Sequence, residues 1–166
     1  TAVRLQQFDI GIVSRSPPYL GVHSLYQTEV NYVALVPQNH PLAASKDRLD
    51  LREVAGREEF ITFGNVYPLE MQGMEEDLAT QFQNKARYSV ANVLAATALV
   101  RAVGVPALVD PFSARMSASA GGMVIRPIQQ KLTYHIGIIT RGIEVMNRET
   151  RQLADALISR FEADPL

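Results

Sequence analysis

Cysteine is absent from the 166 residues of this chain, and its absence removes several kinds of chemistry at once. Without thiols there are no disulfides, no thiolate nucleophile and no cysteine ligands for zinc or an iron–sulfur cluster. Every apolar run is far shorter than the roughly 20 residues that a membrane-spanning helix needs. The opening residues, TAVRLQQFDIGIV, lack the charged and then apolar layout of a signal peptide. These absences predict a soluble, cytoplasmic protein with no membrane attachment.

An excess of charge of either sign is also missing. Sixteen basic and seventeen acidic side chains leave a net charge of −1, and no basic stripe stands out. A chain of this kind is a poor candidate for gripping a nucleic-acid backbone by itself. Apolar residues make up 47% of the sequence and charged residues 20%, which is typical of a globular protein. The length suits one domain or two small lobes with a buried core.

Motifs for catalysis and for cofactors are missing as well. The chain holds no Gly-x-Ser-x-Gly, no Gly-x-Gly-x-x-Gly and no P-loop, and no convergent acid–base or nucleophilic set. His23 and His135 lack a carboxylate or a second histidine at metal-ligand spacing. His40 lies in the turn NHPLA and is expected to form local hydrogen bonds. The sequence therefore predicts a protein that is not an enzyme and holds neither a metal nor a cofactor.

Short apolar runs alternate with amphipathic segments, a pattern that predicts an α/β fold with largely parallel strands. The helix after Pro68 is expected to bury Met71, Met74, Leu78 and Phe82, and Asn147 is expected to cap the last helix. The predicted strands are Phe8–Val13, Asn31–Pro37, Glu58–Asn65, Lys85–Val90, Val105–Val109, Gly122–Pro127 and Leu132–Arg141. The predicted helices are Asp50–Gly56, a segment from Pro68, Asn92–Gly104, Asp110–Ala118 and a segment from Asn147.

The order of these segments resembles the effector-binding domain of LysR-type transcriptional regulators. The matching pieces are FDIGIV, LVPQNHPLA, DLREVAG, EEFITFG, LVRAVGVPALVDPFSA and VIRPIQ followed by YHIGIITR and a helix. They span almost the whole chain in the family's order. The variant VDPFSA looks closest to regulators that sense opines and related amino acids.

The resemblance implies a fold like that of type II periplasmic binding proteins, with two Rossmann-like lobes and a small effector in the cleft between them. It assigns residues 14–128 to lobe II, and residues 1–13 and 129–166 to an incomplete lobe I whose first strand–helix units are missing. It also implies a homodimer or tetramer formed through lobe I. DNA would be bound only through a domain that is not present here, and RNA polymerase is a further partner that the resemblance allows.

Three places at the carboxyl ends of predicted parallel strands are candidates for ligand contact, because open α/β sheets bind their ligands there. Each has a structural alternative: a helix-capping turn at the first, a helix cap at the second and the N-cap of the next helix at the third. The resemblance adds Ser14, across the cleft from these places. The candidates are Thr62, Phe63, Gly64 and Asn65 in the first loop, Ser89 in the second place, and Asp110 and Phe112 in the third.

The function predicted from these features is the sensing of a small effector, amino-acid- or opine-like, by a bacterial transcription regulator. In this hypothesis the effector's carboxylate contacts Thr62 and the following helix's amides, and its ammonium lies near Asp110. Effector binding would shift the population between two lobe arrangements. The alternative is a free-standing solute-binding protein of the same fold.

Overall fold

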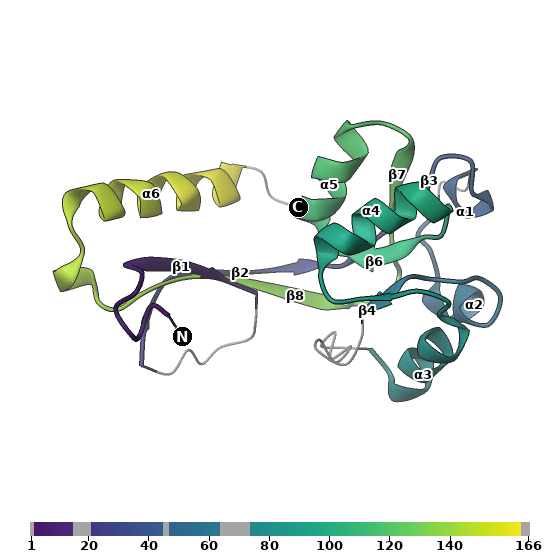
Figure 1. The fold of residues 1–166 in the computed structure, drawn as a ribbon, viewed down its shortest axis with the longest axis horizontal. Helices are drawn as coiled ribbons and strands as arrows, with labels where there is room; N and C mark the ends of the chain where they lie inside the picture. The colour runs from purple at the N-terminus through teal and green to yellow at the C-terminus, as the bar shows by residue number, and fades with distance from the viewer. Residues whose placement is uncertain (1, 15–20, 45–46, 64–73, 164–166) are drawn as a thin grey trace. The chain divides into compact units, whose positions relative to one another are not determined.

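The computed structural model describes residues 2–14, 21–44, 47–63 and 74–163. The chain forms two compact units, each with its own strands and helices (Figure 1). Unit 1 contains Thr1–Val30 and Tyr134–Leu166, and unit 2 contains Asn31–Thr133. The α/β class is therefore confirmed. The lobe boundaries that the resemblance implies remain a prediction.

The structure contains eight strands, six α-helices and one 3₁₀ helix within its described residues. The strands are β1 Ile10–Val13, β2 His23–Asn31, β3 Val33–Pro37, β4 Thr62–Phe63, β5 Ser89–Val90, β6 Ala107–Val109, β7 Met123–Pro127 and β8 Thr133–Thr140. The helices are α1 Pro41–Ala44, α2 Leu51–Ala55, α3 Glu76–Lys85, α4 Val93–Val103, α5 Pro111–Ser119, η1 Ile143–Val145 and α6 Arg148–Ala163.

Unit 1 is built around a three-stranded sheet in the order β1-β8-β2. β1 is antiparallel to β8, with Ile10 opposite Thr140. β1 covers residues 10–13 of the strand predicted at residues 8–13. The apolar run indicates a buried strand, but β1 is an edge strand of the described sheet and Ile12 is 57% exposed. β2 was not predicted, although polar Gln27 and Glu29 lie between less exposed neighbours there, which is the period of a strand with one covered face.

The last helix, α6, packs against the sheet of its own unit. Asn147 caps it as predicted, since its Oδ1 accepts a hydrogen bond from the backbone N–H of Thr150 at 2.7 Å. Ala154 is buried, whereas Leu153 is 51% exposed. Phe161 stacks on Tyr26 of β2 with 5.9 Å between ring centroids. The contact face of α6 therefore excludes Leu153.

Unit 2 has β3 at the centre of a three-stranded sheet in the order β6-β3-β7. β3 is antiparallel to both neighbours, with Ala34 opposite Leu108 on one side and Arg126 on the other. A parallel bridge between Ile61 and Ala107 places β4 beside β6, and β5 is parallel to β4. The prediction of largely parallel pairing was thus wrong for β3.

The direction of each strand follows from its connection. A helix separates each strand from the next between β4 and β7, so these four run the same way, as strands joined by helical crossovers do. β3 instead follows β2 with only Tyr32 between them. It lies between β6 and β7 in the opposite direction.

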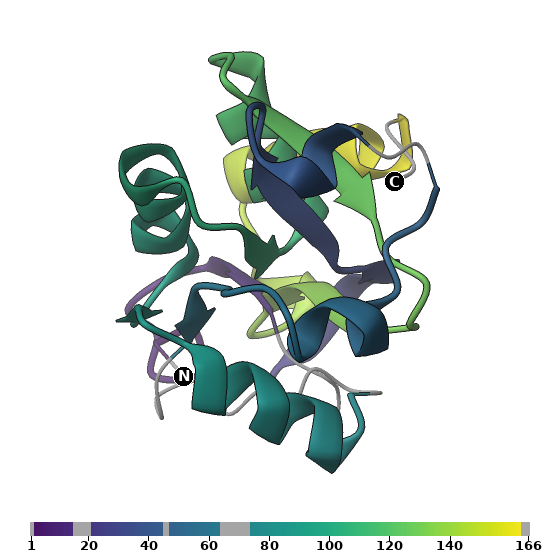
Figure 2. The same ribbon diagram turned by 90° about the vertical axis from the view of Figure 1, so that its right-hand side faces the viewer.

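The core of unit 2 lies on both faces of β3. Ala34, Leu35 and Val36 are each 0% exposed, and their side chains alternate between the faces. Leu35 belongs to the cluster formed with α4 and α5, whereas Ala34 and Val36 belong to the cluster formed with α2 and α3. Helices therefore cover both faces of the sheet, in an α/β/α arrangement (Figure 2).

Several predicted helix ends are confirmed. Gly56 follows α2 as its C-cap, as predicted, and Asp50 caps the other end of the helix, where no cap was predicted, by accepting a hydrogen bond from the N–H of Arg52. Gly104 ends α4 in the left-handed region, with φ +74°, where glycine carries no steric cost. One helix begins later than expected: α3 starts at Glu76. Residues 64–73, including Pro68 and Met71, lie outside the described residues.

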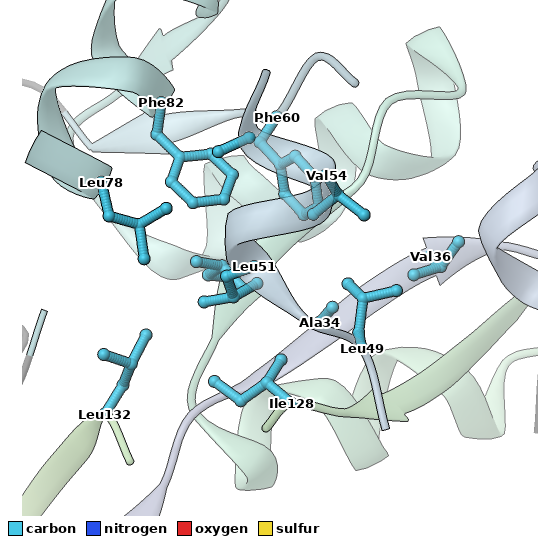
Figure 3. Packing of buried hydrophobic residues seen from close by; sticks show 12 residues of the cluster. Ala34, Val36, Leu49, Leu51, Val54, Phe60, Leu78, Phe82, Ile128 and Leu132 are labelled. Carbon is cyan, nitrogen blue, oxygen red and sulfur yellow. The ribbon is translucent and has the colours of Figure 1, made fainter. Parts of the chain in front are cut away.

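The phenyl ring of Phe82 packs in the apolar cluster that α2 and α3 form with the sheet (Figure 3). It is 2% exposed and meets the Phe60 ring edge-on at 5.0 Å. Removing a buried phenyl group loses its transfer free energy and leaves a cavity.

We expect Phe82→Ala to lower the free energy of unfolding by about 3–5 kcal/mol, measured by chemical denaturation. Met116→Ala is the control, because Met116 is 60% exposed on α5; its effect should stay within about 0.5 kcal/mol. Similar losses in both variants would contradict the assignment of Phe82 to the core.

Candidate functional site

The carboxyl ends of β4, β5 and β6 meet at one edge of unit 2. Thr62 lies opposite Ser89 in the parallel pair β4–β5, and the bridge from Ile61 to Ala107 aligns β4 with β6. Since all three strands run the same way, the residues that follow them emerge at the same edge. Thr62, Ser89 and Asp110 thus belong to three adjacent parallel strands or follow directly after them.

Thr62 is 7% exposed. Its Oγ1 donates to the carbonyl of Tyr88 at 3.4 Å, which turns the side chain toward β5. Because that hydroxyl proton is already engaged, the oxygen is left to accept a hydrogen bond. Phe63 is only partly buried and packs against the cluster beneath α4 and α5. Thr62 is thus a hydrogen-bond acceptor at this edge, whereas Phe63 contributes packing.

Ser89 does not cap α4, so that structural alternative was wrong. It is exposed and is the first residue of β5. The cap is Asn92, whose Oδ1 accepts from the N–H of Ala95 at 2.9 Å. Both are good capping residues, and only Asn92 lies directly before the apolar helical run. The hydroxyl of Ser89 is therefore not needed to begin the helix.

Asp110 is the N-cap of α5, as its structural alternative proposed. Its Oδ1 accepts from the N–H of Ser113 at 2.9 Å, and Pro111 occupies the start of the helix, where proline lacks no required N–H. The residue is 6% exposed, and Phe112 in the same turn is half-buried. This hydrogen bond explains the carboxylate's position without a ligand, and it leaves open whether a ligand also contacts it.

Two helix N-termini lie at this edge, because α4 follows β5 and α5 follows β6. Neither helix has an acidic residue in its first turn, so their positive dipole ends are opposed only by the capping groups. α3 differs, since Glu76 and Asp77 occupy its first turn. The edge thus offers amide N–H groups, a threonine oxygen and one aspartate, which can contact both ends of a zwitterion.

A small apolar cavity of about 10 Å³ lies beside Thr62. That volume is about the space of one water molecule, so an effector does not fit inside. Its lining residues are Phe60, Ile61, Thr62, Phe63, Met74, Phe82 and Leu108. A ligand would therefore contact the edge itself.

The remaining candidates belong to unit 1 or lie outside the described residues. Ser14 is exposed, follows β1 directly and belongs to unit 1. Gly64 and Asn65 lie outside the described residues, as does the helix start expected at Pro68. Contacts from these three residues remain a prediction.

His40 and His135 each lie beside a glutamate. His40 Nδ1 accepts from the N–H of Leu42 at 3.2 Å, and its Nε2 lies 3.7 Å from a Glu58 carboxylate oxygen. His135 Nδ1 lies 3.4 Å from Glu29 Oε1, a pair that the sequence spacing did not reveal. Across the described residues, no three His, Cys, Asp or Glu side chains gather as metal ligands would. No described helix is long and apolar enough to cross a membrane.

Comparison with known proteins identifies related domains. Residues 1–162 match the family model described as the LysR substrate binding domain. The regulatory domain of MetR from N. meningitidis is 20% identical, with a TM-score of 0.63, and the match covers 98% of this chain and 77% of that one. No match was found among curated proteins.

Two further solved structures share the fold. The CcmR regulatory domain from Synechocystis PCC6803, in complex with 2-PG, is 14% identical with a TM-score of 0.67, and the match covers 95% of this chain and 76% of that one. The OxyR regulatory domain from Pseudomonas aeruginosa, in its reduced form, is 19% identical with a TM-score of 0.64, and the match covers 93% and 74%.

The cap formed by Asp110 predicts a difference between two substitutions. Asp110→Ala should lower the free energy of unfolding by about 1 kcal/mol, whereas Asp110→Asn should change it little, since asparagine caps helices about as well. Urea denaturation of the three proteins measures this. Equal losses for alanine and asparagine would show that the charge, rather than the capping oxygen, stabilises α5.

Proposed function

The chain belongs to the LysR substrate-binding domain family, and on that premise we propose that it is the effector-sensing domain of a bacterial transcription regulator. The observation that carries the proposal is the meeting of β4, β5 and β6 at one edge. Thr62, Ser89 and Asp110 lie on these strands or directly after them, and two helices begin nearby. We assign the chain no enzymatic activity of its own.

We propose an effector that is amino-acid- or opine-like. Its carboxylate contacts the amides at this edge and the hydroxyl of Thr62, which would then donate to the effector instead of to the Tyr88 carbonyl. Its ammonium contacts Asp110. The shikimate complex of QuiR and the 2-PG complex of CcmR support small-molecule binding by this fold. They do not specify the ligand of this chain. We assign six further residues to effector contact: Phe63, Gly64, Asn65, Ser89, Phe112 and Ser14.

Unit 2 is our candidate for lobe II, and unit 1 for lobe I. The effector would bind two arrangements of the domain with different affinities and shift the population between them. DNA contact belongs, in this proposal, to a domain outside the 166 residues, and the whole regulator acts in the cytoplasm, where RNA polymerase is a further partner.

The charge of Asp110 separates a ligand role from a cap role. For a cationic amino acid or an opine, Asp110→Asn should weaken binding by roughly 1.5–3 kcal/mol, the value of a hydrogen bond to a charged group. The measurement is calorimetric titration of L-arginine, and of an arginine-derived opine, into a full-length regulator and its variant. If both proteins bind equally, Asp110 is a cap only.

Self-association through unit 1 is the second part of the proposal. Large apolar side chains are exposed on this unit, among them Phe8 at 64% and Ile12 at 57%. Six of the nine large apolar side chains that are exposed among the described residues belong to this unit, and such a concentration favours a surface that another chain covers. The other four of this unit are Leu5, Ile143, Val145 and Leu153.

We expect Ile12→Lys to weaken self-association at least tenfold while the chain stays folded, because lysine is well tolerated on edge strands. Sedimentation velocity measures the association constant. Met116→Lys is the matched control, since Met116 is equally exposed in unit 2. If the two variants associate equally, unit 1 is not the interface.

A further inference from the structure

Hydrogen bonds join the two connections between the units to one another at the border of unit 2. The chain passes between units at Val30–Asn31 and again at Thr133–Tyr134. Asn31 Nδ2 donates to the carbonyl of Gln130 at 3.0 Å, and its Oδ1 accepts from the N–H of Leu132 at 2.6 Å. The amide side chain of Asn31, on the first connection, thus forms hydrogen bonds with two residues next to the second connection, which we call the returning segment.

A main-chain hydrogen bond adds to this pair. The N–H of Tyr32 donates to the carbonyl of Leu132 at 2.8 Å. Leu132 is 0% exposed and packs in the cluster that includes Leu51 of α2. The returning segment is therefore anchored by its side chain in the core as well as by its backbone.

The side chain of Gln130 links the returning segment to α2 by hydrogen bonds. Its Oε1 accepts from the N–H of Leu51 at 2.9 Å, and its Nε2 donates to Asp50 Oδ1 at 2.7 Å. Asp50 Oδ1 also accepts from the N–H of Arg52 at 2.9 Å. The hydrogen bond from Gln130, together with that from Arg52, lowers the pKa of the Asp50 carboxyl below its ordinary value of 3.8. Asp50 is thus held as an acceptor at the start of α2.

We propose that Asn31, Gln130 and Asp50 form a clasp that makes the two connections move as one element. The clasp is a conformational device that limits how widely the orientation of unit 1 varies against unit 2. Any reorientation then takes place in the chain outside it, beginning at the Val30–Asn31 and Thr133–Tyr134 borders. This inference is independent of which effector binds.

The hydrogen-bond pattern permits an exchange of partners as a test. Gln130→Glu places a second carboxylate against Asp50 and removes the donor, so the contact between residues 130 and 50 opens at neutral pH. The two Asn31 bonds reach backbone atoms and are not removed by this substitution. Adding Asp50→Asn restores the contact with reversed polarity. The amide nitrogen introduced at position 50 donates to the new carboxylate, while the amide oxygen still accepts from the N–H of Arg52. The double variant has the same net charge as the native chain.

Absence of cysteine allows a pair of spin labels to be attached at chosen places. Ser24→Cys on β2 and Met116→Cys on α5 are both exposed positions, one in each unit. Double electron–electron resonance, with labelled chain diluted in unlabelled chain, gives the distribution of distances between them. Amide hydrogen exchange at Leu51 reports in parallel whether its bond to residue 130 is intact.

Gln130→Glu should widen the distance distribution at least twofold and speed exchange at Leu51 at least tenfold. The double variant should return both toward the native values. Asn92→Ala, which removes a similar asparagine–backbone bond at the cap of α4, should leave the distance distribution unchanged. If Gln130→Glu fails to fold, Asn31→Asp replaces it, since it abolishes the donation to the Gln130 carbonyl and should widen the distribution likewise.

Three results would overturn the inference. The first is an unchanged distance distribution together with fast exchange at Leu51, which would make Gln130 a local cap of α2 only. Unchanged exchange at Leu51 in Gln130→Glu would show that this bond does not hold the segment. A double variant that stays as broad as Gln130→Glu would show that the Gln130–Asp50 contact is not the cause.

Discussion

Burial of β3 on both faces is the constraint on which unit 2 depends. Three successive residues, Ala34 to Val36, are wholly excluded from solvent, so helices must cover the sheet on both sides. That requirement places α2 and α3 on one face and α4 and α5 on the other. The turn from β6 into α5 then sets Asp110 at the edge where β4 and β5 also end.

In the function that we propose, one aspartate both caps a helix and contacts the effector. At the end of β6 a cap is needed, and a carboxylate supplies it. The cap occupies a place where amides of two helices and the oxygen of Thr62 also converge. The hydrogen bond of the cap fixes the position of the Asp110 carboxylate, and a fixed position is the condition for selective contact with a ligand.

Local patterns in the sequence identified what depends on near neighbours. The caps at Asp110 and Asn147 and the glycine at 104 were predicted from adjacent residues, and each is confirmed. The family resemblance is likewise confirmed by the match over residues 1–162. The direction of β3 was not predicted, because β2, which β3 follows after one residue, was itself missed. The exposure of Ile12 and the partnership of His135 with Glu29 depend on residues far apart in the chain.

The pairing of Ile10 with Thr140 has a consequence for the order in which the molecule assembles. Unit 2 is one continuous stretch, so during synthesis it can collapse as soon as its last strand leaves the ribosome. Among the described strands β1 pairs only with β8, which is made about 130 residues later. Until then the apolar side chains of β1 lack that partner. Slow translation or a truncated message would leave that strand exposed longest, so misassembly is expected to begin there rather than in the unit that carries the candidate site.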